Sequence, residues 1–323
     1  MIRKIPYRYR DHGGFAEEWG VHRNCSEWWY VTGCLTDEAG GMFSFQFTLL
    51  RIRAAFLRPY LLMLALTDFA SGRHLYSQRI TLSSRSVAID ETGVRYGSAA
   101  ALTKRGTGMR LTVSQRDFSL DLSLSSGKGA VWQCDNGCLR MGVDAPRQTT
   151  VYYSCPNMPA TGTVAFGGET KHVTGKAWFD KQGGPYALMN RRTHWEWFSL
   201  RFDDDEELML FSFPQDDYRD GTYIRKDGRC ERFSSCSVTP TEFAYPDGKT
   251  KYSCAWDVAV PGCREGFYRI RPLLKGQMNL GYYELLAGVY NAAGKRVGLC
   301  FTELLPGVYN RRYPVTLFRN TKE

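Results

Sequence analysis

The chain has 323 residues, of which 43% are hydrophobic and 14% aromatic, with 32 glycines and a formal net charge of +9. This length and hydrophobic content can fill one or two cores and exclude a disordered chain. The basic residues are scattered, without a long basic run or a recognisable nucleic-acid motif, so the charge does not predict a nucleic-acid partner.

The residue pattern also predicts the environment of the chain. The segment from Met1 to Arg8 lacks the apolar core of a secretory signal, so we expect a cytoplasmic protein whose ten cysteines are reduced. Cys134 and Cys138 enclose three residues, but no Cys or His pair follows at zinc-finger spacing, and no metal site is expected. The longest apolar run, residues 60–66, is too short to span a bilayer, so no transmembrane segment is expected.

The predicted secondary structure is almost entirely β. Alternating side chains and Gly-containing turns predict a first series of strands at residues 28–35, 42–52, 60–67, 74–82, 87–89, 109–116 and 118–124. A region punctuated by Gly and Pro follows, as far as residue 159. A second series is predicted at residues 163–166, 172–180, 195–202, 208–213, 223–226, 232–239, 252–260, 267–272, 282–290, 297–304 and 315–319. This count suits two barrels, and we expect an all-β protein with domains at residues 1–155 and 156–323.

The first predicted strand places a carboxylate among large aromatic rings. Because strand side chains alternate, Glu27 and Trp29 share one face, and Trp28 and Tyr30 share the other. A carboxyl group beside indole rings is partly desolvated, which raises its pKa, as a proton donor near neutral pH requires. The alternative is that the tryptophans form the core and each acid lies at a solvated strand end.

A looser version of this pattern occurs at residues 194–198. Here Glu196 shares a face with His194 and Phe198, opposite the face of Trp195 and Trp197. His194 is suited to relay a proton or position water, since the unperturbed pKa of histidine is near 6.5. A hydrogen-bonded structural histidine is the alternative.

Five segments occur together in an order typical of one known family: Glu27-Trp28-Trp29-Tyr30-x-x-Gly33, Phe45-Gln46-Phe47-Thr48-Leu49-x-Arg51, Tyr152-Tyr153-Ser154-x-Pro156, Val173-x-Gly175-x-Ala177-Trp178-Phe179-Asp180-x-Gln182 and Trp195-x-Trp197-Phe198. This order resembles the AttH/CrtC family, which contains carotenoid 1,2-hydratase (hydroxyneurosporene synthase) and predicted secreted hydrolases and is related to lipocalin-like pericyclases. Near the C-terminus, Tyr282-Tyr283-Glu284 and Phe301-Thr302-Glu303 resemble the closing hairpin of that family. The resemblance implies two lipocalin-like antiparallel β-barrel domains packed together, with an apolar ligand chamber. It also implies reactions on polyenes, prenyl groups or other hydrophobic chains, without a metal or redox cofactor.

Some features depart from the family pattern. Residues 183–185 read Gly-Gly-Pro where the family usually has a Trp, Tyr283 replaces a Trp of the closing hairpin, and the secretion signal common in the hydrolase branch is missing. The substrate is therefore expected to differ. No Gly-x-Ser-x-Gly elbow and no Ser-His-Asp order support acyl transfer, and no Gly-x-Gly-x-x-Gly supports a nicotinamide or flavin cofactor.

Addition of water to an isolated alkene needs an acid, a pocket that tolerates a carbocation and a placed water molecule. We rank Asp180 first as the acid, because Trp178 lies two residues earlier and therefore on the same strand face. Glu196 is second, with His194 as its possible relay. The predicted catalytic residues are thus Asp180, Glu196 and His194.

The predicted substrate-binding residues supply aromatic faces, hydroxyl groups or charges. Aromatic faces attract cations, and the tyrosine hydroxyls are able to orient a substrate oxygen or cap the core. For Glu27 and Arg51 the alternative is an ion pair that joins the first hairpin to the second domain. The predicted set is Glu27, Trp29, Tyr30, Arg51, Tyr152, Tyr153, Trp178, Trp195, Trp197, Tyr283 and Glu284.

The sequence therefore predicts a cofactor-independent, acid-catalysed hydratase, isomerase or cyclase, hence a lyase or isomerase, for a hydrophobic unsaturated small molecule such as a prenyl, polyene or terpenoid-like compound. One alternative is a non-catalytic lipophilic carrier, since lipocalin-like barrels hold ligands by apolar burial alone. Another is a pericyclase that folds a linear polyene without an acid. Substrate identity, the location of the pocket and the oligomeric state stay open at this level.

Overall fold

A computed structural model describes residues 4–54, 57–142, 148–185, 195–280 and 282–305, and these residues form two compact units. The first unit takes its residues from 4–131 and 148–185, and the second from 132–142 and 195–305. Nearly all elements are strands, so the all-β expectation is confirmed. No helix in the described ranges has the length and apolar content needed to cross a membrane.

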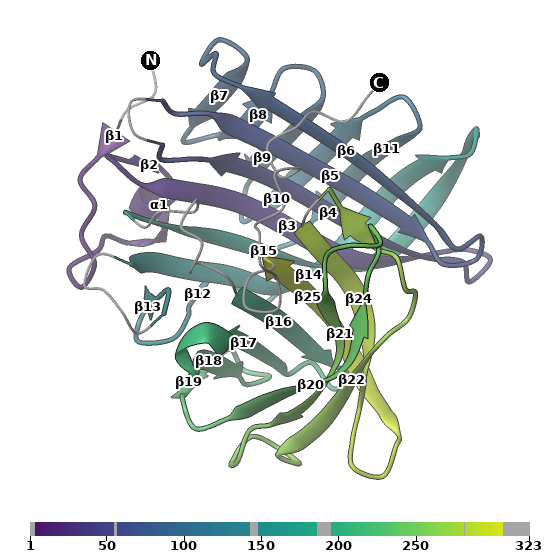
Figure 1. Ribbon diagram of the computed structural model, residues 1–323. Coiled ribbons are helices and arrows are strands. Elements are labelled where there is room, and N and C mark those ends of the chain that lie inside the picture. Colours follow the sequence, from purple (N-terminus) through teal and green to yellow (C-terminus); the bar gives the residue numbers. More distant parts are fainter. Residues whose placement is uncertain (1–3, 55–56, 143–147, 186–194, 281, 306–323) are drawn as a thin grey trace. The chain divides into compact units, whose positions relative to one another are not determined.

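The first unit is built on one long antiparallel sheet that curls into a half-barrel (Figure 1). Its strands follow the order β6-β5-β4-β3-β15-β14-β11-β10-β9-β8-β7. The bounds are β3 Ser26–Asp37, β4 Met42–Arg51, β5 Tyr60–Asp68, β6 Arg73–Thr81, β7 Val87–Asp90, β8 Gly93–Tyr96, β9 Ala100–Arg105, β10 Gly108–Ser114, β11 Phe118–Leu124, β14 Thr149–Phe166 and β15 Glu169–Gly184. Shorter elements of this unit are β1 Lys4–Ile5, α1 Phe15–Glu18 and β2 Val21–His22; β12 Val131–Trp132 begins at its boundary, and β13 Cys138–Arg140 belongs to the residues of the second unit.

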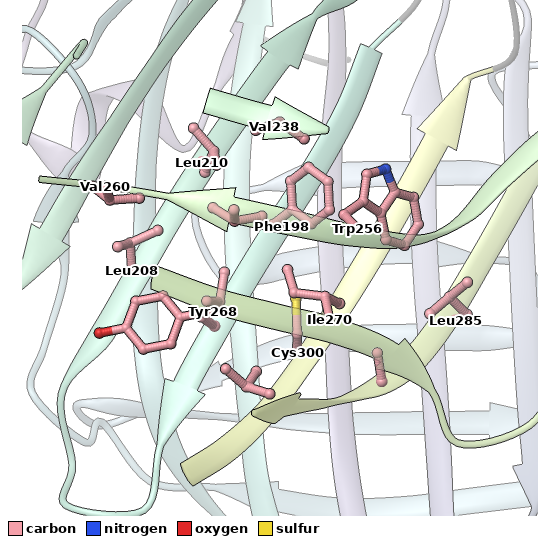
Figure 2. Close-up of a cluster of buried hydrophobic side chains, with 14 of the residues drawn as sticks. Phe198, Leu208, Leu210, Val238, Trp256, Val260, Tyr268, Ile270, Leu285 and Cys300 are labelled. Carbon is pink, nitrogen blue, oxygen red and sulfur yellow. The ribbon is translucent and has the colours of Figure 1, made fainter. Parts of the chain in front are cut away.

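The second unit contains another curled antiparallel sheet, in the order β19-β18-β17-β16-β25-β24-β22-β21-β20, with β23 beside β24. The bounds are β16 Trp195–Phe202, β17 Glu207–Phe213, β18 Tyr218–Ile224, β19 Cys230–Phe233, β20 Ser237–Ala244, β21 Tyr252–Ala259, β22 Phe267–Pro272, β23 Met278–Asn279, β24 Tyr282–Tyr290 and β25 Arg296–Leu305, with a 3-10 helix at Pro214–Asp216. One face of this sheet packs a dense apolar core, in which Phe198 meets Trp256 edge to face at 5.1 Å between ring centroids (Figure 2).

The structure differs from the sequence expectation at a few strands. No strand was predicted between residues 124 and 163, but β14 runs through the end of this region and absorbs its irregularity in a bulge between Cys155 and Met158. Within that bulge Asn157 has φ of +52°, a left-handed conformation that Asn tolerates better than most residues. Residue 155, the expected domain boundary, therefore lies inside β14, a strand of the first unit.

Two further differences concern short or edge strands. β8 and β9 were not expected, and the strand expected at residues 232–239 is divided into β19 and β20, which lie at opposite ends of the sheet order. Short strands carry too few residues for alternation to mark them clearly. The strand expected at residues 315–319 lies outside the described residues.

Candidate functional site

Six side chains on six neighbouring strands, five of them polar, form a line across one face of the first unit, which we call the polar row. Successive members are direct register partners across the sheet, so they share a face. None is more than 4% exposed. The members are Gln78 on β6, Met63 on β5, Thr48 on β4, Tyr30 on β3, Asp180 on β15 and Ser154 on β14.

Two hydrogen-bond donors hold the carboxyl group of Asp180, one from the polar row and one from the residue two positions earlier on β15. Ser154 Oγ donates a hydrogen bond of 2.5 Å to Asp180 Oδ1, and Trp178 Nε1 donates one of 2.6 Å to the same oxygen. Trp178 and Asp180 therefore share a face, as their spacing predicted. Ser154 lies 26 residues away in the sequence, and no local pattern pointed to it as a partner. The two bonds fix the orientation of a buried carboxyl group.

Side chains alternate between the two faces along β14, so the consecutive residues Tyr152 and Tyr153 lie on opposite faces of the sheet. Tyr152 is the register partner of Gln182, which lies two residues after Asp180, so Tyr152 belongs to the face of the polar row. Tyr153 belongs to the opposite face, where its ring packs against Phe179 at 6.0 Å, and burial raises its pKa well above the usual value. Tyr152 is thus the one of this pair that lies near the carboxyl group.

Trp29 also lies on the face opposite the polar row. Its indole nitrogen donates a hydrogen bond of 3.2 Å to the carbonyl oxygen of Trp19, and the Lys181 ammonium lies 4.6 Å from its ring centroid. Trp29 therefore does not share a sheet face with Asp180. The structure brings Tyr30, Tyr152, Trp178 and Asp180 to one face and leaves Trp29 and Tyr153 on the other.

Glu27 and Arg51 form a buried ion pair, as in the structural alternative, but the pair lies within the first hairpin and does not join it to the second domain. They are register partners on β3 and β4, with Arg51 Nη1 at 3.3 Å from Glu27 Oε2. Glu27 Oε1 also lies 3.2 Å from Lys181 Nζ and 2.7 Å from His22 Nδ1. Burial acts to raise the pKa of Glu27, but these neighbours outweigh it and the net shift is downward. The carboxylate of Glu27 is thus saturated by protein partners.

His22 links Glu27 to a second buried acid that the sequence did not single out. Its Nε2 lies 3.0 Å from Glu18 Oε2, and its Nδ1 faces Glu27. Burial acts to lower the pKa of His22, but the bonds to Glu18 and Glu27 outweigh it, and the net shift is upward. The cluster therefore joins α1, β2, β3, β4 and β15 through charge, which is a structural role.

In the second unit, Glu196 lies in the interior of the sheet curl, with Phe198 on the same face of β16. It is 3% exposed, and Ser253 Oγ donates a hydrogen bond to its Oε1. Burial raises the pKa of Glu196 to about 7, against the opposing effects of Ser253, Trp256 and Arg219. Trp256 lies near enough to affect the carboxyl group, but its N–H does not meet it with hydrogen-bond geometry. His194, the expected relay, lies outside the described residues.

The opposite face of β16 carries a separate group of acids and aromatic rings. Trp195 Nε1 donates a hydrogen bond of 2.9 Å to Glu303 Oε1, and the Tyr282 hydroxyl donates to the same oxygen. Trp197 and Glu284 are the register partners of Glu303 on its two sides, so they share this face. Glu196 is therefore separated from the two predicted tryptophans by the sheet itself.

The two predicted residues of β24, Tyr283 and Glu284, lie on opposite faces of the sheet. Asn279 Nδ2 donates a hydrogen bond to Glu284 Oε2. Tyr283 turns to the other face and packs against Tyr252 at 5.2 Å, inside the apolar core. Of the two predicted residues of the closing hairpin, Glu284 thus lies on the acid and aromatic face and Tyr283 does not.

The chemistry open to these groups is proton transfer and hydrogen bonding. Among the described residues, no group of three or more His, Cys, Asp and Glu side chains is arranged to hold a metal ion. A buried carboxyl group with a fixed orientation, next to a phenol and an indole ring, is suited to give a proton and to stabilise the cation that results.

The AttH-like family matches residues 9–307 of this chain. The chain belongs to the AttH-like family. Among solved structures, this AttH-like chain is similar to a putative AttH from Nitrosomonas europaea, with 24% identity and a TM-score of 0.82 over 93% of this chain and 98% of that one. The family resemblance of the sequence motifs is thereby confirmed.

Two other solved structures share the fold of this AttH-like chain. Kievitone hydratase from Nectria haematococca is 15% identical, with a TM-score of 0.73 over 87% of this chain and 89% of that one. CghA, in a structure with Sch210972, is 11% identical, with a TM-score of 0.53 over 94% of each chain. At these identities the similarity shows a common fold. No curated protein sequence matches the chain.

Proposed function

We propose that this protein is an enzyme that protonates a carbon–carbon double bond of a largely hydrophobic small molecule, with hydration as the leading outcome. One observation carries the proposal: Asp180 is buried in the polar row, with Oδ1 fixed by Ser154 and Trp178. A carboxyl group held in one orientation out of bulk water is suited to general acid catalysis.

The reaction is balanced without an oxidant or reductant. Asp180 gives its proton to one alkene carbon, and the π electron pair forms the new C–H bond. The cation left on the other carbon accepts an oxygen lone pair from water. That water then loses a proton to the Asp180 carboxylate, which restores the acid. Loss of a proton from carbon gives isomerisation instead, and attack by a second double bond gives cyclisation.

Two side chains beside Asp180 are suited to stabilise the cation. Trp178 lies two residues away on the same strand, and Tyr30 is the register partner of Asp180 on β3. An aromatic ring near a cation contributes about 0.5 to 2 kcal/mol, depending on desolvation. The hydroxyl groups of Tyr30 and Tyr152 are candidates to orient water or a substrate oxygen.

The comparisons support this class of reaction. Kievitone hydratase, whose name states a hydration, shares the fold across most of both chains. The family membership supports the same reading, because the motif around Asp180 is one of those on which the resemblance depends.

The proposal is tested by incubating the protein with prenylated and polyene compounds in heavy water and in ¹⁸O-labelled water. We expect a product with deuterium on carbon and, for hydration, ¹⁸O in a new hydroxyl group. Asp180→Asn should abolish that product. Glu196→Gln tests the second candidate acid, since a carboxyl group with a pKa of about 7 is also able to donate a proton.

Each other outcome would assign a different acid or a different class of function to this protein. Loss of the product in Glu196→Gln alone would assign the acid to the second unit. Full turnover in both variants would favour a pericyclase without an acid. Recovery of an unchanged bound lipid, with no deuterium entry, would favour a carrier.

A further inference from the structure

Four polar side chains flank β5 on the face of the polar row, and we call them the polar quartet: Gln46 and Thr48 on β4, and Tyr76 and Gln78 on β6. Gln46 Nε2 donates a hydrogen bond to Thr48 Oγ1, and the Tyr76 hydroxyl donates one of 2.5 Å to Gln78 Oε1. Each bond joins residues two apart on one strand, so the two members of each pair share a face. The register through β5 places both pairs on the same face of the sheet.

The strand between the two pairs carries short or apolar side chains. Ala65 is the register partner of both Gln46 and Tyr76, and Met63 is the partner of both Thr48 and Gln78. Polar pairs therefore lie on both sides of an apolar strip, with Ala65 the smallest member. Gln46, Thr48 and Gln78 are at most 4% exposed, and Tyr76 is half-buried.

The hydrogen bonds of this quartet offset part of the cost of burying its amide and hydroxyl groups, a cost that a purely apolar sheet face would not carry. Val or Leu at these positions would pack the face without desolvating amide and hydroxyl groups. A glutamine amide both donates and accepts hydrogen bonds, so it is able to bond a ligand hydroxyl or carbonyl group. A hydrocarbon against the same face would desolvate these groups and return no hydrogen bond.

We propose that the polar quartet binds an oxygen-bearing group of the substrate, so that the substrate is an oxygenated unsaturated molecule and not a plain hydrocarbon. This inference rests on the proposed function for its reacting centre. Thr48 lies two strands from Asp180 along the polar row and Gln78 lies four strands away, which correspond to about 10 Å and about 19 Å at the usual strand spacing. The oxygen of the substrate is thus separated from the reacting double bond by several carbon atoms.

A matched pair of probes tests this inference by affinity, without requiring turnover. Farnesol and farnesene have related prenyl chains, but only farnesol carries a hydroxyl group. Dissociation constants are measured by quenching of tryptophan fluorescence on the full chain. We expect farnesol to bind at least about tenfold more tightly than farnesene, since one or two buried hydrogen bonds distinguish them.

Substitutions then locate the source of that preference. Thr48→Val and Gln78→Leu should each weaken farnesol binding about fivefold to tenfold and leave farnesene binding unchanged. Thr67→Val is the matched control, because it removes a buried hydroxyl group from β5 that bonds His74 and lies outside the quartet. It should leave both affinities unchanged. Thermal unfolding confirms that each variant is folded before affinities are compared.

The results separate this inference from the proposed reaction. Equal affinity for the two probes, preference for farnesene, binding of neither, or an equal loss in Thr48→Val and Thr67→Val would overturn the recognition of oxygen. A preserved preference for farnesol together with no deuterium entry into any compound would leave oxygen recognition standing and remove the acid chemistry.

Discussion

The indole nitrogen of Trp178 donates a hydrogen bond of 2.6 Å to Asp180 Oδ1, two residues further along the same strand. Side chains at this spacing share a face of the sheet, so the strand itself holds donor and acceptor together. Ser154 approaches the same oxygen from the neighbouring strand. The carboxyl group is consequently oriented by one local contact and one contact across the sheet.

Replacement of Asp180 by Asn should remove the acid and preserve the packing. The amide oxygen can still accept the bonds from Ser154 and Trp178, so we expect a folded protein whose turnover falls at least about 100-fold. Turnover with an active substrate and circular dichroism melting check both parts. Ser154→Ala retains the carboxyl group and should reduce turnover less. A larger loss in Ser154→Ala than in Asp180→Asn would contradict the assigned roles.

Replacement of Trp178 by Phe should separate orientation of the acid from aromatic packing. Phe keeps an apolar ring at this position but lacks the N–H donor, so we expect turnover to fall about tenfold with little change in KM. Trp29→Phe is the matched control, since it removes an indole N–H donor that bonds the Trp19 carbonyl oxygen on the sheet face opposite the polar row. It should alter stability while leaving the turnover of folded protein unchanged. Similar kinetic losses in both variants would argue against the orienting role of Trp178.

Glu27→Gln should destabilise the first unit without altering the chemistry. Glu27 neutralises Arg51 and Lys181 in a fully buried site, and removal of one partner from such a cluster costs about 3 kcal/mol. Urea unfolding measures the loss. Asp121→Asn serves as the control, because the Arg110–Asp121 pair is about half exposed and its loss should matter much less. Equal effects of the two substitutions would rule out the structural role assigned to Glu27.

Much of this arrangement was predictable where the pattern is local. The alternation of side chains along β3 and β15 predicted that Trp178 and Asp180 share a face and that Glu27 and Tyr30 lie on different faces of β3. The structure has both relationships. The partners contributed by distant strands were missed, because sheet register is not local in sequence. Ser154 and Lys181 reach their acids across 26 and 154 residues, respectively.

Backbone irregularity explains the main error in the fold. Pro156 and Pro159 lie in the region where no strand was predicted, whereas β14 continues through them with a bulge. Gly162 pairs with Leu122 of β11, and a Cβ at Gly162 would come within 2.0 Å of the Asp121 carbonyl oxygen. The glycine therefore permits close approach of two strands, which is a different use of glycine from a turn.

The stability of the protein should depend on the ionisation of Glu196 between pH 4.5 and 7. The unfolded carboxyl group releases its proton near pH 4.5, whereas burial raises its pKa to about 7 in the folded chain. The folded state therefore binds more protons in this window, so the free energy of unfolding falls as pH rises, by about 3 kcal/mol in total. Glu196→Gln stays neutral, and its stability relative to the parent protein should increase across the same window.

Urea unfolding of both proteins from pH 4.5 to 8 measures this difference directly. Taking the difference at each pH removes the contributions of His22 and of the other titrating groups that the two proteins share. A difference that stays constant with pH would show that Glu196 has the same pKa in the folded and unfolded states.

The deuterium content of the product in heavy water tests the acid role of Asp180 most directly, measured for the parent protein and for Asp180→Asn with the same substrate. The account predicts one solvent-derived deuterium on carbon with the parent protein and none above background with the variant. A product that forms in the parent protein without carbon-bound deuterium, or that forms equally well in the variant, would contradict it.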